Sequence, residues 1–240
     1  MNVQVRKVAL VTGGTRGIGA AVTRVLLRDG FAVVASNRGG GPDFAEPVAV
    51  VSGDLAMPGA AEQVWADALA VHGRIDVLVN NAGAWLPSPV DDQAGWDEGW
   101  AANLAVNLTA PANLCRLAIQ HFRERGGGVI VNITSRSAHR GDDPGHLAYG
   151  AAKGGLLALT RGIARGFARD RVLAYAVAPG PVATDMVAGV ADYDETARQL
   201  PMGEITPPED VAEAVGFLAS GRSPHATGTT IDISGADYVR

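Results

Sequence analysis

The chain has 240 residues, of which 47% are hydrophobic and 19% charged, with a formal net charge of −5 and one cysteine. That single cysteine, Cys115, excludes an internal disulfide and a cysteine metal cluster, so neither a disulfide-stabilised secreted fold nor a metal site is expected. The acidic balance argues against nucleic-acid and membrane-surface partners, which usually select a basic excess. No apolar run reaches the ~20 residues that span a bilayer, and the first residues lack a signal-peptide core, so we expect a cytoplasmic protein.

Short apolar runs alternate with helix-like stretches along the chain, and the runs themselves do not alternate with polar residues. Such runs are typical of parallel strands that are covered on both faces. In chain order we expect a strand at 8–11, a helix at 17–29, strands at 31–35 and 48–51, a helix at 58–72, a strand at 75–79, a helix at 95–124, a strand at 129–133, a helix at 148–169, a strand at 172–177, a helix at 208–219 and a strand at 229–233. This order predicts an α/β doubly wound fold with right-handed crossovers.

One connection departs from the alternation of strands and helices. Residues 37–47, between the second and third strands, are few and are rich in glycine and proline. A full crossover helix hardly fits into so short a segment, because parallel strands are usually joined by a dozen or more residues. We therefore expect a shortened crossover there, formed by a loop or at most one helical turn.

A glycine-rich turn joins the first strand to the first helix, and Gly13, Gly17 and Gly19 give it the spacing Gly-x-x-x-Gly-x-Gly. Without a Cβ at these positions, the chain can turn tightly and its backbone can approach a pyrophosphate, which the helix N-terminus attracts. A glycine turn alone also occurs for packing reasons. Its place between a first strand and a first helix favours a nucleotide site.

The end of the second strand indicates which nucleotide binds. NAD-binding domains carry an acidic residue there that accepts hydrogen bonds from the ribose 2′-OH, whereas this chain has Asn37 followed by Arg38. No carboxylate would repel a 2′-phosphate, and Arg16 and Arg38 could clamp one through bidentate hydrogen bonds. Two solvated surface arginines are the alternative, but their positions together favour NADP(H) as the cofactor.

Further motifs follow in a fixed order: Asn80-Asn81-Ala82-Gly83, Asn107, Ser135, Tyr149-x-x-x-Lys153 and Pro179-Gly180-Pro181-Val182-Ala183-Thr184. With the glycine turn, they resemble the short-chain dehydrogenase/reductase family over residues 7–234. The resemblance implies one Rossmann domain over residues 1–240, with a seven-stranded parallel sheet in the order 3-2-1-4-5-6-7 and a substrate lid at 185–206. It also implies an enzyme that transfers a hydride between a nicotinamide cofactor and a carbonyl or secondary alcohol.

Tyr149 and Lys153 are four residues apart, so they lie one turn apart on the same face of a helix. A free phenol has a pKa near ~10, and a lysine ammonium one turn away lowers it toward the operating pH, where acid–base catalysis is efficient. Ser135, at the end of a strand, can hold the substrate oxygen, with Ser137 as a competing candidate. In the resembled family, the residue at Asn107 holds a water that links Lys153 to solvent. The resulting catalytic set is Asn107, Ser135, Tyr149 and Lys153.

The resemblance also implies the contacts with the cofactor. The adenine would face the residues after the third strand, the adenosine ribose those after the fourth, and the nicotinamide those after the sixth. The expected cofactor-binding residues are Gly13, Thr15, Arg16, Gly17, Ile18, Gly19, Asn37, Arg38, Asp54, Leu55, Asn81, Ala82, Gly83, Tyr149, Lys153, Pro179, Gly180, Val182 and Thr184.

The sequence constrains the substrate less closely. Residues 85–87, the polar loop 136–147 and the apolar lid are the expected pocket walls, with a purely solvated loop as the alternative for 136–147. The chain is most similar to 3-oxoacyl-acyl-carrier-protein reductases, which implies reduction of a ketone or 3-oxoacyl substrate, either free or bound to a carrier protein. Oxidation of a cyclic alcohol or dihydrodiol in secondary metabolism is one alternative, and a non-catalytic NADP-binding sensor or scaffold is another.

The family resemblance further implies a homotetramer, with the helices at 95–124 and 148–169 forming contacts between protomers. In the resembled subgroup an acidic carrier protein docks on arginines near the ends of helices. The arginines near those ends in this chain are Arg123, Arg125, Arg169 and Arg171. Ordinary cations that complement the helix dipole are the competing explanation for them.

Overall fold

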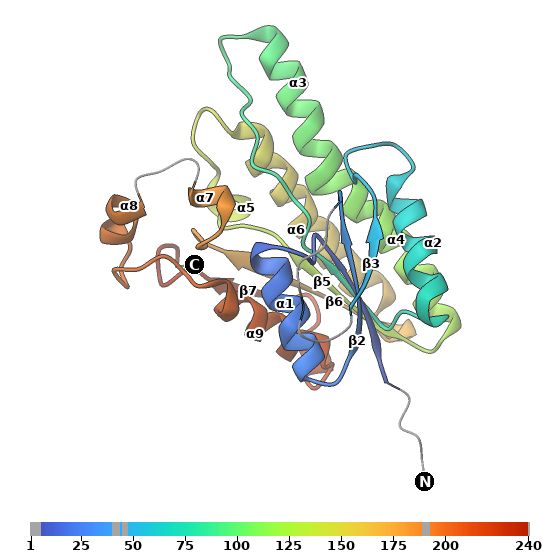
Figure 1. Ribbon diagram of the computed structural model, residues 1–240. Helices are drawn as coiled ribbons and strands as arrows, with labels where there is room; N and C mark the ends of the chain where they lie inside the picture. Colours follow the sequence, from blue (N-terminus) through green and yellow to red (C-terminus); the bar gives the residue numbers. More distant parts are fainter. Residues whose placement is uncertain (1–5, 40–43, 45–47, 189–192, 240) are drawn as a thin grey trace.

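The computed structural model describes residues 6–39, 44, 48–188 and 193–239. Its centre is a seven-stranded parallel sheet with the strand order β3-β2-β1-β4-β5-β6-β7, which confirms the predicted topology. Figure 1 shows this sheet between its flanking helices. The strands are β1 (Val8–Thr12), β2 (Ala32–Asn37), β3 (Ala49–Ser52), β4 (Val77–Asn80), β5 (Gly128–Ile133), β6 (Val172–Pro179) and β7 (Thr230–Ile233).

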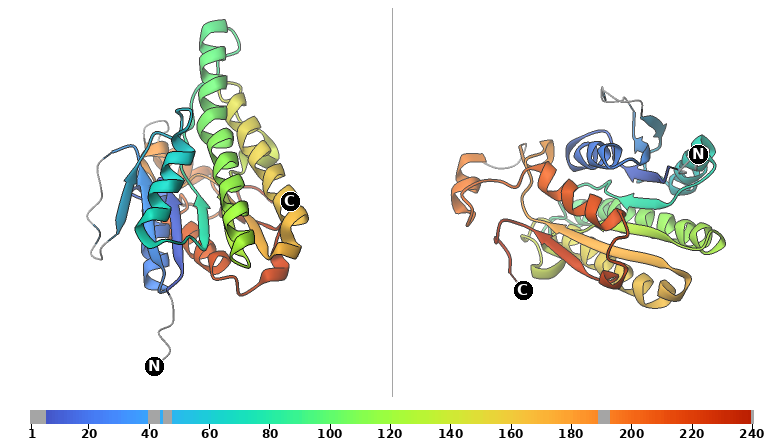
Figure 2. Two further views of the ribbon diagram at one scale, coloured as in Figure 1. Left: turned by 90° about the vertical axis from the view of Figure 1, so that its right-hand side faces the viewer. Right: turned by 90° about the horizontal axis from the view of Figure 1, so that it is seen from below.

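Helices cover both faces of the sheet, as the two views of Figure 2 show. On one face α1 (Gly17–Arg28) packs against α9 (Pro208–Ala219). The other face is covered by α2 (Ala60–His72), α4 (Ala110–Glu124) and α6 (Leu147–Phe167). Neighbouring strand residues point to opposite faces, and both sets are buried in separate apolar clusters under these two layers. Strands that are apolar throughout therefore fold as a sheet covered on both sides.

The long helix expected at 95–124 has a break in its middle. It consists of α3 (Gln93–Leu104), the π-helix η1 (Ala105–Thr109) and α4. Figure 1 shows that α3 extends away from the sheet, while α4 packs against it. The prediction of one regular helix was therefore wrong, although the segment is helical from one end to the other.

A proline explains this break in the helix. Pro111 has no N–H, so it cannot donate the α-helical hydrogen bond to the carbonyl of Asn107 one turn earlier. The backbone accommodates this by taking one extra residue into the turn, and the Ala110 N–H donates to the carbonyl of Ala105. Because Asn107 lies within the irregular turn, the proline shapes the surroundings of a predicted catalytic residue.

Several short helices occupy segments that we expected to be loops. They are α5 (Ser137–Arg140), α7 (Asp185–Ala188), α8 (Tyr193–Gln199) and the 3₁₀ turn η3 (Pro224–Ala226). The helix expected at 148–169 ends in a further 3₁₀ turn, η2 (Ala168–Asp170). Part of the expected lid, at 189–192, lies outside the described residues, as do 40–43 and 45–47 in the connection between β2 and β3. Among the helices of the described part, none has both the length and the apolarity that crossing a membrane requires.

A buried polar network links the centre of the sheet to the helices behind it. The Asn80 amide on β4 donates to Asn132 Oδ1 on β5 at 2.9 Å, and the Asn132 amide donates to Thr160 Oγ1 on α6 at 2.8 Å. The Cys115 thiol on α4 accepts a weaker bond from Asn80 at 3.3 Å. Burial raises the pKa of this thiol to about 12, so Cys115 stays a neutral packing group rather than a nucleophile.

Replacing Asn132 with alanine tests how much this network stabilises the fold. The variant leaves polar groups of Asn80 and Thr160 buried without their partner, which costs about 2–4 kcal/mol of the free energy of unfolding. Urea denaturation followed by fluorescence measures the change. The matched variant Asn113→Ala removes a half-buried amide beside a surface groove and is expected to change stability by at most about 0.5 kcal/mol. Equal losses in the two variants would contradict a stabilising role for the network.

Candidate active site

The glycine turn between β1 and α1 is shaped by contacts that leave no room for side chains. Gly13 and Gly17 have φ angles of 61° and 48°, in the left-handed region that favours glycine. A Cβ on Gly19 would lie 2.0 Å from the carbonyl oxygen of Gly13, so only glycine fits where the helix folds back on the turn. Because these positions carry no side chains, a pyrophosphate could approach the backbone from the outer side of the turn.

The N-terminus of α1 faces this open side of the turn. Arg16, at the N-cap position, is extended, and in the described structure it makes no side-chain hydrogen bond that would cap the helix. The first N–H groups of the helix are therefore available to an anion. A Cβ on Gly17 would lie 3.0 Å from Thr184 Cγ2, so the loop after β6 meets the glycine turn across this opening.

The segment after β4 holds the turn in place. The Asn81 amide donates to the carbonyls of Thr12 at 2.9 Å and Gly13 at 3.2 Å, and the Ala82 N–H donates to Thr12 Oγ1 at 3.0 Å. We expected Asn81 to pack on the adenosine ribose. Its side chain instead fixes the glycine turn, so only the backbone of this residue remains for the cofactor.

The end of β2 brings together the residues expected to select the nucleotide. The Asn37 amide donates to Thr15 Oγ1 at 3.3 Å, and Asn37 Oδ1 accepts from the Gly39 N–H at 3.0 Å. Arg38 and Arg16 are both exposed beside this pair. The two exposed arginines could therefore reach a phosphate next to Thr15 and Asn37.

The residues expected at the adenine lie after β3. The Asp54 side chain is exposed and accepts a hydrogen bond from the Ala56 N–H at 3.1 Å. The Leu55 side chain is only 7% exposed and belongs to the apolar cluster under α2 and α4. Leu55 can therefore meet a cofactor through its backbone, not through its side chain.

Tyr149 lies on the first turn of α6, facing the end of β5. A hydrogen bond joins its hydroxyl to that of Ser135, the residue preferred from the sequence. Ser137 contacts Ser135 instead, with its N–H donating to Ser135 Oγ at 3.1 Å. Burial raises the pKa of Tyr149 to about 12, and the Ser135 hydrogen bond opposes this shift without cancelling it. The lowered pKa that we expected is therefore not found.

Lys153 lies one turn after Tyr149 and is almost fully buried, at 4% exposure. Its ammonium lies 5.7 Å from the centroid of the Tyr149 ring and donates to the carbonyl of Ile133 at 2.9 Å. Burial lowers the pKa of Lys153 to about 8, because the charged form loses its hydration. Lys153 is then still mostly protonated at neutral pH, but it can release a proton readily.

Asn107 completes the cluster from the π-helix. Its amide is fully buried and binds both backbone groups of Ala84, accepting from the N–H at 3.2 Å and donating to the carbonyl at 2.8 Å. A Cβ on Gly83 would lie 2.8 Å from Asn107 Oδ1 and 3.3 Å from Lys153 Nζ, so both side chains approach Gly83 from the same side. The four predicted catalytic residues thus come together from α6, β5 and η1.

The loop after β6 passes beside this cluster. A Cβ on Gly180 would lie 3.0 Å from that of Ser234, so Gly180 is needed where the chain passes the end of β7. Val182 is 4% exposed and pairs with Thr206, which ties the expected lid back to the loop. Pro179 accepts a hydrogen bond from the Arg136 N–H at 2.9 Å, directly after Ser135.

Two interactions near Tyr149 were not predicted from the sequence. The Arg136 charge lies close enough to lower the pKa of Tyr149, against the larger effect of burial. Trp85, expected as a pocket wall, stacks on His146 with ring centroids 3.5 Å apart, and His146 Nδ1 pairs with Asp143 at 2.9 Å. The effect of Arg136 on Tyr149 could have been predicted, because Arg136 directly follows Ser135 in the sequence. The stacking of Trp85 on His146 could not, because it joins two segments that are far apart in the sequence.

Comparisons with known proteins agree with this geometry. A family model described as Enoyl-(Acyl carrier protein) reductase matches residues 13–235. An acetoacetyl-CoA reductase of Shinella zoogloeoides is 36% identical over 97% of this chain and 98% of its own length. A 3beta-hydroxysteroid dehydrogenase 1 of Eggerthella lenta is 34% identical over 95% of this chain and 92% of its own length.

A solved structure is similar over nearly its whole length. It is a 3-ketoacyl-(acyl-carrier-protein) reductase from Brucella melitensis complexed with NADH, with a TM-score of 0.86 and 27% identity over 97% of this chain and 98% of that one. The relatives are dehydrogenases and reductases of ketones and alcohols, and their cofactor is a nicotinamide nucleotide where one is named. With its parallel sheet, glycine turn and match over residues 13–235, the chain belongs to the short-chain dehydrogenase/reductase family.

Proposed function

We propose that the protein is an NADP(H)-dependent reductase that converts a ketone or 3-oxoacyl group into the secondary alcohol. The observation that carries the proposal is the meeting of Ser135, Tyr149, Lys153 and Asn107 beside a glycine turn whose backbone is open. A nicotinamide nucleotide fits this turn, because Cβ atoms at Gly13, Gly17 and Gly19 would fill or distort its cradle.

The proposed roles follow from the contacts of each side chain. When bound, the nicotinamide supplies the hydride that reduces the carbonyl carbon. The Tyr149 hydroxyl gives its proton to the carbonyl oxygen, and the Ser135 hydroxyl, bonded to that of Tyr149, holds the same oxygen. Because burial raises the pKa of Tyr149, the residue stays protonated at neutral pH, which suits a proton donor in the direction of reduction.

Lys153 and Asn107 would return the proton to Tyr149. The ammonium of Lys153 lies beside the tyrosine ring, and burial lowers its pKa to about 8, so it can pass on a proton near neutral pH. Asn107 Oδ1 and Lys153 Nζ both lie close to Gly83, and in this proposal a water bridges the two atoms. In this proposal Asn107 therefore connects Lys153 to solvent.

The preference for NADP(H) rests on Asn37, Arg38 and Arg16. Replacing Asn37 with aspartate keeps the oxygen that accepts from the Gly39 N–H, and it adds a negative charge where the 2′-phosphate would lie. At a distance of about 4–5 Å, this repulsion is worth about 2–4 kcal/mol. We expect kcat/KM for NADPH to fall about 100-fold, while that for NADH changes little, in steady-state kinetics with both cofactors.

The matched control for this prediction is Gln120→Glu. It also replaces an amide with a carboxylate, on an exposed side chain near the end of α4 that is not among the expected cofactor-binding residues. The ratio of kcat/KM for the two cofactors is expected to stay at the wild-type value in this variant. If Asn37→Asp also kept the wild-type ratio, the 2′-phosphate would not bind at the end of β2, and the proposed preference would be wrong.

A cyclic alcohol is the second candidate class of substrate. The relative named as a hydroxysteroid dehydrogenase acts on a ring alcohol, so oxidation of a cyclic alcohol is the second candidate. The deciding experiment measures NADPH oxidation by the wild type with acetoacetyl-CoA, cyclohexanone and 1-decalone. A carbonyl-dependent rate supports a reductase and ranks the substrate classes. NADPH binding without turnover of any carbonyl or of the matching alcohols would favour a non-catalytic sensor or scaffold.

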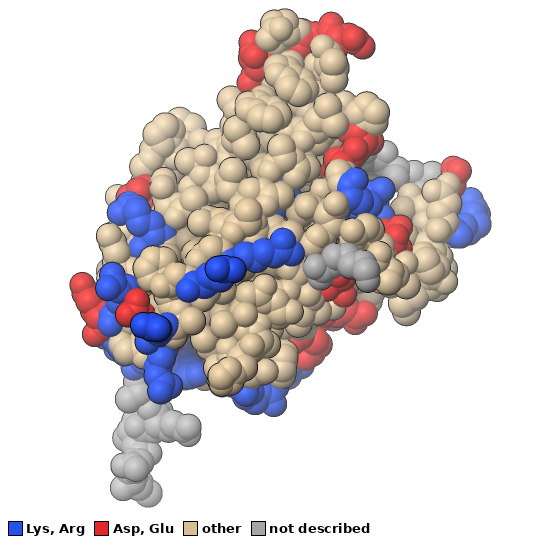
Figure 3. All heavy atoms as spheres, turned by 180° about the vertical axis from the view of Figure 1, so that it is seen from behind, with Lys and Arg blue, Asp and Glu red and all other residues tan. Residues whose placement is uncertain are grey.

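The proposal also covers the oligomeric state of the protein and its location in the cell. The chain would form one Rossmann domain with a lid at 185–206 and work in the cytoplasm as a homotetramer. Figure 3 shows a mostly uncharged surface below the acidic side chains at the far end of α3, with basic side chains across the middle and at the lower left of this view. Trp100 on α3 is 36% exposed and stacks on Trp96, so α3 offers an exposed aromatic side chain for a contact between protomers. A free or carrier-bound acyl group remains compatible with this arrangement.

A further inference from the structure

The last residues of the chain lie against the helix that follows Ser135. We call residues 235–239 the C-terminal segment. Asp237 in this segment forms an ion pair with Arg136, and both side chains are mostly buried, at 19% and 23% exposure. The ring of Tyr238 stacks on that of His139 in α5, with centroids 5.7 Å apart and an angle of 11° between planes. Two contacts therefore join the C-terminal segment to residues 136–140.

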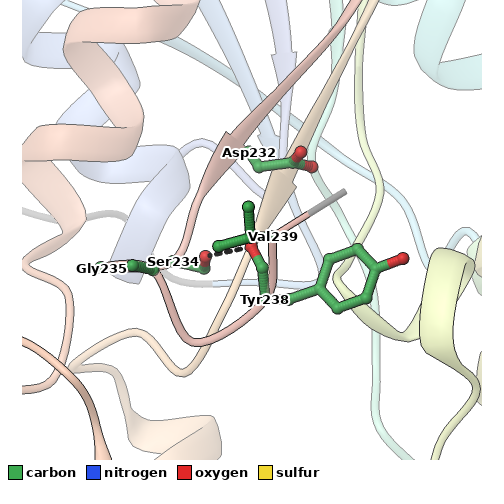
Figure 4. Close-up of a pocket in the computed structure, with 6 residues that line it drawn as sticks. Asp232, Ser234, Gly235, Tyr238 and Val239 are labelled. Carbon is green, nitrogen blue, oxygen red and sulfur yellow. Dashed lines mark hydrogen bonds between the residues drawn. The ribbon is translucent and has the colours of Figure 1, made fainter.

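A third contact comes from β7, directly before the C-terminal segment. His139 Nε2 lies 3.6 Å from Asp232 Oδ1, and the His139 side chain is only 7% exposed. Figure 4 shows Asp232 and Tyr238 extending in the same direction, from the strand and from the segment that follows it. The imidazole is thus held between a carboxylate and an aromatic ring, which fixes α5 from one side.

Polar contacts rather than apolar packing hold the C-terminal segment. It borders an open surface cavity of about 380 Å³, lined by Asp232, Ser234, Gly235, Ala236, Tyr238 and Val239. The Val239 side chain is 76% exposed, and Ala236 adopts a left-handed φ of 65°, which costs a non-glycine residue energy. The contacts with Arg136 and His139 are therefore the ones that join the segment to residues 136–140.

Arg136 connects this segment to the chemistry. Its N–H donates to the carbonyl of Pro179 in the loop beside the cluster, and its neighbour Ser135 bonds to the Tyr149 hydroxyl. Its guanidinium faces the charges of Arg140, Asp142 and Asp237, and it acts on Tyr149. The Arg136 charge lowers the pKa of Tyr149, whereas Asp142 raises it. Moving Arg136 would therefore change both the placement of Ser135 and the ionisation of Tyr149.

We propose that Arg136 and Asp237 are positioning residues of the active site, and that the C-terminal segment completes this site by holding Arg136 beside Ser135 and Tyr149. The inference rests on the proposed function, since it assumes that Tyr149 transfers the proton. It predicts that a change at the end of the chain alters the chemical step and the ionisation of Tyr149, although Asp237 touches neither the tyrosine nor the serine.

The test compares Asp237→Asn and Arg136→Met with the wild type in the direction of alcohol oxidation, where Tyr149 must lose its proton. NADP⁺ with 3-hydroxybutyryl-CoA, or cyclohexanol where it is the better substrate, serves as the probe between pH 6 and 10. In both variants Tyr149 loses the nearby cation, so the rising limb of the kcat profile is expected to shift to higher pH by about half a unit to one unit. At pH 7.5 kcat falls about 3- to 10-fold, as this shift of the limb implies, and KM for NADP⁺ stays within twofold.

Two further variants separate positioning from a merely structural effect. Asp237→Glu keeps the carboxylate and is expected to restore at least half of the wild-type kcat and the wild-type pH profile. Asp170→Asn breaks the exposed ion pair with Arg123 at the opposite end of α6 and is expected to leave both unchanged. Thermal unfolding is recorded for all variants, so that a loss of rate is read only from folded protein.

Three outcomes would overturn the inference. The first is a pH dependence of kcat in Asp237→Asn and Arg136→Met that equals that of the wild type, whether or not the variants are less stable. The second is a shift of the rising limb of the kcat profile to lower pH in Asp237→Asn, which would mean that Arg136 stays in place without its partner. The third is a loss of rate that Asp237→Glu does not rescue. Failure of the proposed function is distinguished from all three, because it would appear as a wild type without turnover or as full activity in Tyr149→Phe.

Discussion

Replacement of Tyr149 with phenylalanine is expected to lower kcat for carbonyl-dependent NADPH oxidation about 1000-fold, since general acid catalysis contributes roughly 10²–10⁴-fold. The ring still fills its place on α6 beneath the Lys153 ammonium, so the fold and the affinity for NADPH change little. Only the hydroxyl that bonds to Ser135 is lost. Steady-state kinetics with the best ketone, together with fluorescence titration of NADPH, measure the two quantities separately.

The matched control is Tyr175→Phe on β6. The Tyr175 hydroxyl donates to the carbonyl of Ser223 at 3.1 Å, in the core and away from the catalytic cluster. Its loss is expected to reduce the free energy of unfolding by about 1 kcal/mol and to leave kcat within twofold. A Tyr149→Phe variant as active as the wild type would remove Tyr149 from the mechanism.

Replacement of Gly19 with alanine is expected to abolish measurable binding of NADPH. The new Cβ would lie 2.0 Å from the carbonyl oxygen of Gly13, and neither backbone segment can move without opening the turn. The Asn81 amide, 2.5 Å from the same Cβ, would lose its bonds to Thr12 and Gly13 as well. We expect the dissociation constant for NADPH to rise more than about 100-fold, and the free energy of unfolding to fall by about 3 kcal/mol.

The same chemical change at Gly162 is the control. This residue lies within α6, is exposed, and a Cβ added there meets nothing within 4 Å. Gly162→Ala is expected to stabilise the protein by about 0.5–1 kcal/mol, because alanine favours the helix, and to bind NADPH as the wild type does. Similar titrations for Gly19→Ala and Gly162→Ala would show that the turn does not form the nucleotide site.

The sequence predicted those parts of the molecule that depend on local pattern. Apolar runs such as 8–11 and 129–133 became strands of the central sheet, on either side of β4, because a strand that is apolar on both faces is typical of a parallel sheet covered by two layers. The glycines of the first turn and the spacing of Tyr149 and Lys153 likewise fix short-range geometry. Ser135 was preferred over Ser137 because it ends a strand, and it is the serine that bonds to Tyr149.

The parts that could not be predicted depend on contacts between distant segments or on burial. The raised pKa of Tyr149 results from desolvation, which no spacing of residues shows. The side chains of Asn81 and Leu55 contact the glycine turn and the core, so a contact of these residues with the cofactor would be made by their backbone. The pairing of Arg136 with Asp237 joins residues a hundred positions apart. Pro111, within the helix expected at 95–124, was a local signal for the irregular turn.

The π-helix at Ala105–Thr109 has an evolutionary consequence. A turn of this kind is what a single inserted residue leaves in an α-helix, because the helices on both sides keep their own faces while the extra residue is absorbed between them. Deleting one residue from the turn would therefore leave α3 and α4 packed as they are, and it would rotate Asn107 by ~100° away from Gly83 and Lys153. A proton path could thus be gained or lost by one codon, without rebuilding the core.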